Sequence, residues 1–246
     1  MVENKIVVIT GAGISVESGI KPFRGTNGIW NENPTSMATY AKFTEDPAHF
    51  LSWYYERFVS SKDALPNATH EILAKESIRV ITQNVDNLHK KAGHPQDSLI
   101  EIHGNINFKR KIQASSLREL VVANWEDVDP ENLVEELFRV FNIGKGGVID
   151  QIESYRPQIL LFDEFYTDLY ESEIALDWVN DAETVIFMGT SNSVGITSMT
   201  LEMAYRKGKQ IIVVDPNPSP SLLLPGVEVF KEMASDFCKR FFSSAE

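Results

Sequence analysis

Three short groups of residues in this chain have the chemistry of a ligand site, and each follows an apolar run. They are Gly11-Ala12-Gly13 after Lys5–Thr10, Gln83-Asn84-Val85-Asp86 after Ile78–Thr82, and His103 at the end of Leu99–His103. A turn of small residues that opens a helix can present backbone N–H groups and the helix dipole to a phosphate. A histidine at the end of a strand is a candidate general base. Together these patterns favour a nucleotide site with an acid–base group beside it.

Each group also has a purely structural interpretation. The first turn is not the dinucleotide fingerprint G-x-G-x-x-G, because the glycine after Gly13 is Gly19. Phe23 and Arg24 add an aromatic ring and a guanidinium beyond this turn, although they could equally be a packed ring and a surface charge. The amides around Asn84 could serve only as turn hydrogen bonds, and a lone histidine is often merely hydrogen-bonded.

Parallel strands separated by helices would position all of these groups. Two further apolar runs, Thr184–Met188 and Gln210–Val214, enclose an amphipathic stretch at Met199–Lys207, and Asp236–Phe242 is expected to be a closing helix. This alternation predicts an α/β fold with a doubly wound, Rossmann-like parallel sheet. The polar groups would then gather on one edge of the sheet, as a dinucleotide site requires. They begin at Gly11, Gln83, His103, Gly189 and Asp215.

A second possible pocket involves a helix that begins at Asp46-Pro47. Aromatic residues follow at helical spacing, and most residues of this kind belong to a core. Tyr54 and Arg57 are three positions apart, so on a helix they share one face. They could therefore line a pocket together, or Tyr54 could pack in the core while Arg57 lies on the surface. Another helix is expected from Pro66 to Lys75.

The segment 105–155 differs in character from the rest of the chain. It lacks strong strand patterns, carries charged pairs and contains one expected helix, Pro130–Phe141. We interpret it as a smaller module inserted into a single domain that spans residues 1–246. Arg156–Phe162 is expected to return to the main sheet.

Composition excludes several classes of protein. The chain has 246 residues, 43% of them hydrophobic, which is enough for a full core. The net charge of −12 makes a nucleic-acid partner improbable, and no apolar run is long enough to predict a membrane span. The single cysteine, Cys238, forbids an internal disulfide and any cysteine-rich zinc site. No signal-peptide pattern is present at the start, so the expected location is the cytoplasm.

The ordered motifs of the chain resemble those of the sirtuins, the family of NAD-dependent protein deacylases. The matching motifs are GAGISVESGIKPFRG (Gly11–Gly25), PNATH (Pro66–His70), TQNVDNLH (Thr82–His89), EIHG (Glu101–Gly104), RPQILLFDE (Arg156–Glu164) and GTSNSV (Gly189–Val194). They span about Lys5 to Asn217, and their common order is far more specific than any one of them alone.

The resemblance implies that NAD is the co-substrate. The first glycine turn would hold the pyrophosphate, the residues from Gln83 to Asp86 would surround the ribose and the carboxamide, and Gly189 to Ser191 would hold the adenosine half. The full set of implied cofactor-binding residues is Gly11, Ala12, Gly13, Ser15, Gly19, Phe23, Arg24, Trp30, Gln83, Asn84, Val85, Asp86, Gly189, Thr190, Ser191, Asp215, Pro216 and Asn217.

The resemblance also implies the reaction and the substrate. Nicotinamide leaves the ribose, and the acyl oxygen of an acyl-lysine protein or peptide attacks the ribose carbon. His103 would then activate a ribose hydroxyl as a base, with Asn84 as the second catalytic residue, and the acyl group would leave as O-acyl-ADP-ribose. The implied substrate-binding residues are Tyr54, Arg57, Ile159, Phe162, Glu164, Ser193 and Val194.

The first half of the chain is most similar to the members that remove succinyl and malonyl groups. The similarity lies in FRGTNGIW (Phe23–Trp30), MATYAKF (Met37–Phe43) and the pair Tyr54-x-x-Arg57. In that subgroup the tyrosine and the arginine bind the carboxylate at the end of an acidic acyl chain.

Three departures from the family pattern stand out. The family carries four zinc-binding cysteines after the HG motif, and this chain has none there, so zinc is expected to be absent. Asp163 replaces a glycine of the peptide-binding strand, and Ile196-Thr197 replaces Pro-Ala. Without zinc, the module would need an apolar core, for which the candidates are Leu117, Leu120, Val121, Leu133, Leu137 and Phe141.

Two other functions fit the same residues. One is a sirtuin-like NAD hydrolase or ADP-ribosyltransferase that needs no acyl peptide. The other is a non-catalytic NAD sensor, although the presence of Asn84 and His103 argues against it. Nicotinamide release with and without an acyl peptide distinguishes all three. The sequence leaves the oligomeric state open.

Overall fold

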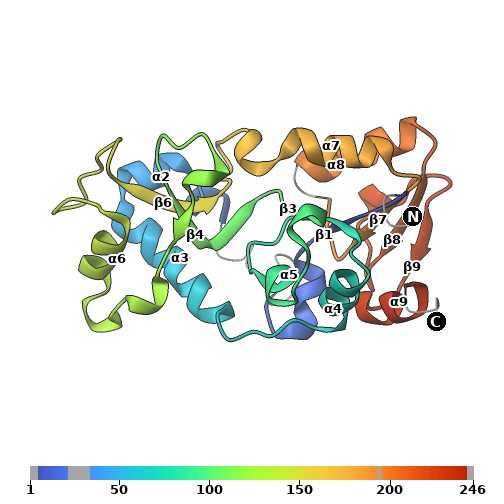
Figure 1. Cartoon of the computed structure of the whole chain (residues 1–246), viewed down its shortest axis with the longest axis horizontal. Coiled ribbons are helices and arrows are strands. Elements are labelled where there is room, and N and C mark those ends of the chain that lie inside the picture. Colours follow the sequence, from blue (N-terminus) through green and yellow to red (C-terminus); the bar gives the residue numbers. More distant parts are fainter. Residues whose placement is uncertain (1–4, 22–33, 193–194, 243–246) are drawn as a thin grey trace.

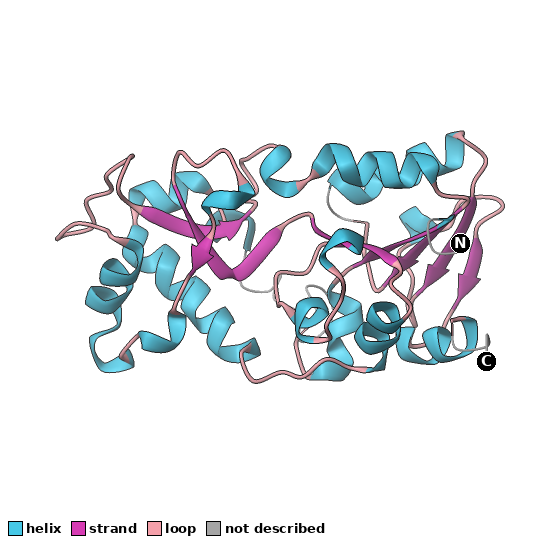
Figure 2. Ribbon diagram, viewed as in Figure 1, coloured by secondary structure: helices cyan, strands magenta, loops and turns pink. Residues whose placement is uncertain are grey.

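The computed structural model describes residues 5–21, 34–192 and 195–242, and in this part of the chain it contains two sheets (Figures 1 and 2). The larger sheet has six strands, and every neighbouring pair in it is parallel. In spatial order these are β3 (Leu99–Glu101), β2 (Arg79–Thr82), β1 (Ile6–Thr10), β7 (Thr184–Met188), β8 (Gln210–Val214) and β9 (Glu228–Phe230). The prediction of a doubly wound parallel sheet is confirmed.

The helices surround this sheet and fill the second part of the molecule (Figure 1). The described α-helices are α1 (Pro34–Met37), α2 (Tyr40–Glu45), α3 (Pro47–Ser61), α4 (Ala68–Lys75), α5 (Leu88–Lys91), α6 (Leu133–Phe141), α7 (Ser172–Asp181), α8 (Gly195–Arg206) and α9 (Ala234–Phe241), and short 3-10 helices lie before and between them. None of those in the described ranges combines the length and the apolar character that crossing a bilayer requires.

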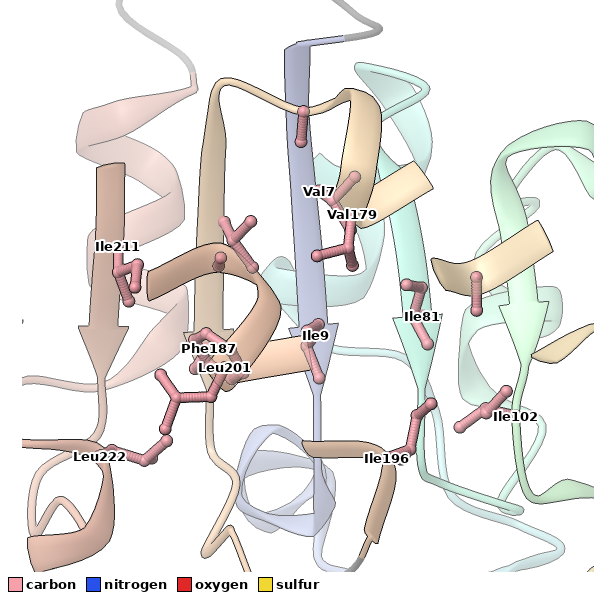
Figure 3. Close-up of a cluster of buried hydrophobic side chains, with 14 of the residues drawn as sticks. Val7, Ile9, Ile81, Ile102, Val179, Phe187, Ile196, Leu201, Ile211 and Leu222 are labelled. Atoms are coloured by element: carbon pink, nitrogen blue, oxygen red, sulfur yellow. The ribbon is translucent and has the colours of Figure 1, made fainter. Parts of the chain in front are cut away.

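Both faces of the large sheet are apolar because its central strands are buried on both sides. Side chains alternate along β1, so Val7 and Ile9 belong to one core and Val8 belongs to the other. Figure 3 shows the first core, in which Val179 of α7 and Leu201 of α8 pack against the strands. Helices α4 and α9 supply the core on the opposite face.

The smaller sheet contains β5 (Val121–Val122), β4 (Gly104–Lys111) and β6 (Tyr155–Ile159) in that order, and its pairs are antiparallel. The prediction that Arg156–Phe162 returns to the main sheet is therefore wrong. A central parallel strand is apolar throughout, whereas β6 carries Arg156, Pro157 and Gln158. Proline lacks a backbone donor and is tolerated at a sheet edge, which is where β6 lies.

The core behind the smaller sheet draws on two stretches of the chain, one from Ala38 to Phe58 and one from Ile106 to Leu161. Trp125 is at its centre, with its ring centroid 4.8 Å from that of Phe141. Leu137 and Phe141 are buried as expected. Leu117 and Val121, in contrast, are exposed, so these two residues do not form the core.

Candidate active site

A cavity of about 1040 Å³ lies at the carboxyl ends of the central strands and extends between the two sheets. Its walls bring together most of the residues that the motifs singled out. Those that line it are Gly11, Ala12, Gly13, Tyr54, Arg57, Gln83, Asn84, Val85, Asp86, His103, Ile159, Phe162, Glu164, Gly189, Thr190, Ser191, Asp215, Pro216 and Asn217. Parallel strands end at one edge of a sheet, and this is why residues so distant in sequence meet.

The glycine turn after β1 packs directly on the turn after β7. The N–H of Gly11 donates to the carbonyl of Met188 at 3.0 Å, and that of Gly13 donates to the carbonyl of Gly189 at 2.9 Å. A Cβ at Gly13 would lie only 2.6 Å from the Cα of Gly189, so a larger residue cannot fit. The expected helix after the turn is a 3-10 helix, Ala12–Ser18. The N–H groups of Gly11 and Gly13 hold the two turns together and are not left for a phosphate.

A hydrogen-bond network orders the amide and the carboxylate that follow β2. The side-chain amide of Asn84 donates to the carbonyl of Gly11 at 3.1 Å and to Ser15 Oγ at 3.2 Å. Ser15 Oγ in turn donates to Asp86 at 2.7 Å. Burial raises the pKa of Asp86, while its bonds from Leu88 N–H and Ser15 oppose this shift. Ser15 is fully buried, so it positions Asn84 and Asp86 from beneath the cavity.

Two threonines hold the side chain of Gln83. Its amide nitrogen donates to Thr197 Oγ1 at 2.6 Å, and its amide oxygen accepts from Thr190 Oγ1 at 3.3 Å. Thr197 is one of the positions at which the chain departs from the family pattern. The hydroxyl that it brings in binds a cavity residue, and the neighbouring Ile196 is buried in the main core.

His103 sits between a backbone carbonyl and a phenol. Its Nδ1 lies 3.0 Å from the carbonyl oxygen of Gln83, and its Nε2 lies 3.0 Å from the hydroxyl of Tyr166. Burial lowers the pKa of His103 to about 4, although the bond to Gln83 opposes the shift. The imidazole is therefore neutral near pH 7, and one nitrogen can accept a proton.

Tyr54 and Arg57 project from α3 into the wall of the cavity near the smaller sheet. Tyr54 is 3% exposed, and its burial raises the pKa of the phenol above the ordinary value. The guanidinium of Arg57 stacks on the ring of Trp53, and its Nη1 donates to the carbonyl of Trp53 at 3.0 Å. Both alternatives for this pair therefore hold in part: Tyr54 packs in the core, and both residues also border the cavity.

Glu164 is partly exposed and is held by an ion pair with the buried Arg156. Its carboxylate accepts from both terminal nitrogens of Arg156 and from the N–H of Leu161, and Arg110 lies 3.8 Å away. Asp163, the second departure from the family, accepts from the N–H groups of Tyr40 and Ala41 and so anchors the start of α2. The replacement of glycine by Asp163 thus has a structural reason.

Several predicted site residues lie elsewhere. Gly19 does not border the cavity; it ends the 3-10 helix in the left-handed conformation, with φ of 84°. Phe23, Arg24, Trp30, Ser193 and Val194 lie outside the described residues.

Sequence reasoning did not single out several residues that border or order the cavity. Among them are Tyr166, Leu160 and Thr197. Leu160 follows β6, and its N–H donates to the carbonyl of His103. Thr197 was visible only as a departure from the family pattern. Nothing in the spacing around Tyr166 marks it, because its partner His103 lies 63 positions earlier.

Comparison with known proteins identifies the family. The Sir2 family model matches residues 11–195. The NAD-dependent protein deacylase of Aeropyrum pernix is 33% identical over 241 residues, which cover 95% of this chain and 89% of that protein. A mutant Sir2 homologue in complex with ADP ribose has a TM-score of 0.80 at 25% identity, and the match covers 97% of this chain and 90% of the other. A complex of Sir2 with a p53 peptide and NAD+ has a TM-score of 0.73 at 25% identity, covering 97% and 92%.

The match spans the glycine turn, the amide cluster after β2 and the histidine after β3, which are the groups that the cavity brings together. The chain therefore belongs to the Sir2 family, the sirtuins, and is an NAD-dependent protein deacylase.

Proposed function

We propose that this deacylase acts on lysines that carry an acidic acyl chain, such as succinyl or malonyl. The observation that carries the proposal is the placement of Tyr54 and Arg57 together in the cavity wall. A guanidinium can bind a carboxylate through two parallel hydrogen bonds. The raised pKa of the Tyr54 phenol keeps its proton in place, so this hydroxyl can donate a further bond.

The charges behind this wall support the same preference. Arg110 and Arg156 are both buried, and together they face the carboxylate of Glu164. Next to the Tyr54 phenol, the two positive charges of Arg156 and Arg57 outnumber the one negative charge of Glu164. An anionic acyl terminus would be attracted to this end of the cavity and could accept charged hydrogen bonds there, whereas the methyl group of acetyl-lysine can accept none.

We also propose the division of roles within the cavity. Gln83, Asn84 and Asp86 bind the nicotinamide ribose and the carboxamide, Gly189 to Ser191 bind the adenosine half, and His103 is the base. NAD supplies the electrophilic ribose carbon when bound. The roles proposed for Asn84 and Asp86 are supported by their hydrogen bonds with Ser15, which hold both side chains in fixed orientations. An acyl-lysine peptide would enter between the loop after β6 and the start of α8.

Replacing Arg57 with alanine tests the acyl preference. We expect wild type to favour a succinyl-peptide over the matched acetyl-peptide in kcat/KM. The Arg57→Ala variant should lose about 10- to 150-fold on the succinyl-peptide, since a charged hydrogen bond contributes about 1.5–3 kcal/mol. Its kcat/KM on the acetyl-peptide should change far less.

Two further variants sharpen this test. Arg57→Lys keeps the charge but not the planar fork, so it should recover only part of the preference. Arg206→Ala, on an exposed part of α8, is the matched control for loss of an arginine. A wild type without a succinyl preference, or an Arg57→Ala variant that keeps one, would reject the acidic-acyl proposal and leave the deacylase itself intact.

We propose that the protein needs no zinc, and that Trp125 stabilises the inserted module, residues 105–155, which lacks the four cysteines of the family pattern. Its indole N–H donates to the carbonyl of Ile106 at 2.6 Å, and its ring stacks with that of Phe58 at 5.9 Å. The single cysteine of the chain cannot assemble a thiolate site. It also supports the expected cytoplasmic location, where thiols stay reduced.

We expect a strong chelator to leave the melting temperature unchanged, and elemental analysis to find no stoichiometric zinc. Trp125→Ala should lower the free energy of unfolding by about 3–5 kcal/mol, because it opens a cavity in a packed core. One tightly bound zinc per chain, or a fall in melting temperature with chelator, would contradict the proposal.

A further inference from the structure

The hydroxyl of Tyr166 lies 3.0 Å from Nε2 of His103, the nitrogen on the side of the ring opposite to the bond with Gln83. The two rings stack at 29° with their centroids 6.0 Å apart. Tyr166 follows β6, whereas His103 follows β3, and both border the same cavity. This contact therefore joins the loop after β6 to the residue proposed as the base.

The partners of His103 determine which nitrogen carries the proton. A carbonyl oxygen can only accept, so the nitrogen facing Gln83, Nδ1, must be protonated. In the neutral ring Nε2 then has the lone pair, and the Tyr166 hydroxyl donates to it. The phenol thus occupies the one acceptor site of the imidazole.

The other side of Tyr166 contacts the start of α8. The backbone of Ile196 makes a hydrogen bond to the phenol oxygen, which lowers the pKa of Tyr166 against the larger effect of burial. A Cβ at Gly195 would lie 3.8 Å from Cε2 of the ring. The side chain therefore bridges the loop after β6 and the start of α8, between which we place the acyl-lysine peptide.

We propose that Tyr166 is a positioning residue that controls access to the His103 base. The ribose hydroxyl that gives up its proton must donate to Nε2, and a single lone pair accepts one strong hydrogen bond. The phenol therefore has to leave Nε2 before the ribose hydroxyl can bind there. Because Tyr166 also spans the peptide cleft, an acyl-lysine that enters between the two walls moves the phenol away and frees the base. This inference rests on the proposed role of His103.

The contact also makes a prediction about protonation. A hydrogen bond donated to the neutral imidazole stabilises the neutral form and so lowers the pKa of His103. Tyr166→Phe removes only the hydroxyl. We expect the pKa of His103 to rise in this variant by about half a unit to one unit, measured by imidazole ¹⁵N NMR over a pH titration. Tyr205→Phe, on an exposed part of α8, is the control. An unchanged pKa of His103 in Tyr166→Phe would overturn the inference.

Kinetics give a second, independent readout. Loss of the competing phenol should raise kcat/KM for the acyl peptide about two- to tenfold at saturating NAD, through a lower KM, because the peptide no longer has to break the bond to Nε2. A tenfold fall in kcat with an unchanged KM would instead indicate that the phenol takes part in proton transfer. That result would refute the proposal that Tyr166 controls access to the His103 base. The base role is judged separately, by His103→Ala. If that variant keeps its turnover, the proposed base is wrong, while the NMR titration still reports whether Tyr166 bonds to His103.

Discussion

Replacing His103 with alanine is expected to lower kcat for deacylation by about 10²- to 10⁴-fold, the usual contribution of a general base. The neutral ring, held by the Gln83 carbonyl, presents Nε2 as the acceptor. Since the pKa of His103 is about 4, protonation of this ring should not limit the rate until the pH falls well below 6. Turnover of an acyl-peptide with NAD, measured as nicotinamide release, gives the rate.

Affinity for NAD should stay within a few fold of wild type in His103→Ala, because the other cavity residues are untouched. His49→Ala is a suitable control, since this histidine lies on the exposed side of α3. Normal turnover in His103→Ala would refute the assignment of the base. A large loss of NAD affinity would mean instead that the substitution disturbed the carbonyl of Gln83 and the strand end.

Acid should destabilise the fold, because three further histidines are buried next to one another. The ring centroids of His70 and His89 are 4.9 Å apart, and those of His89 and His94 are 5.7 Å apart. Within the described residues, each ring has one buried nitrogen without a hydrogen-bond partner. Burial lowers the pKa of all three, in the case of His70 from 6.5 to about 4. The folded protein therefore keeps these rings neutral.

The direction of the pH effect on stability follows from the pH at which the folded and the unfolded chain each bind a proton at His70. Below pH 6.5 the unfolded chain protonates His70, whereas the folded protein does so only near pH 4. The contribution of His70 to the free energy of unfolding is fully present above pH 6.5 and is lost as the pH drops from 6.5 to 4. The loss from His70 alone is about 2 kcal/mol at pH 5 and about 3 kcal/mol at pH 4. Asp86 and Glu101, whose pKa burial raises, act in the opposite direction.

His70→Gln isolates this contribution. His70 accepts from the N–H of Asn67 in a capping box at the start of α4, and glutamine can make the same bond without titrating. Denaturant unfolding at several pH values should show His70→Gln losing about 2–3 kcal/mol less than wild type between pH 7 and pH 4. The exposed His49→Gln should follow wild type. Parallel curves for His70→Gln and wild type would show that the buried cluster does not drive the acid loss.

Much of the large sheet was predictable because its strands are local patterns. Thr184–Met188 and Gln210–Val214 were expected with the bounds that the structure has, since a strand buried on both faces reads as a continuous apolar run. Segments of mixed character were not predictable in this way. The strand β4 has charged residues at its end, and β6 has a proline. Neither sequence therefore reads as a buried strand, and each strand forms because it pairs with the other.

The sequence by itself determined the family, the parallel sheet and the positions at which most cavity residues stand, because strand ends bring polar turns to one edge. Only the tertiary structure decided how those residues are held. Ser15 lies beneath Asn84 and Asp86, Thr197 orients Gln83, and Tyr166 faces His103. Each of these contacts joins segments that are far apart in the sequence, so the local spacing of residues cannot predict it. These contacts form only when the whole molecule packs.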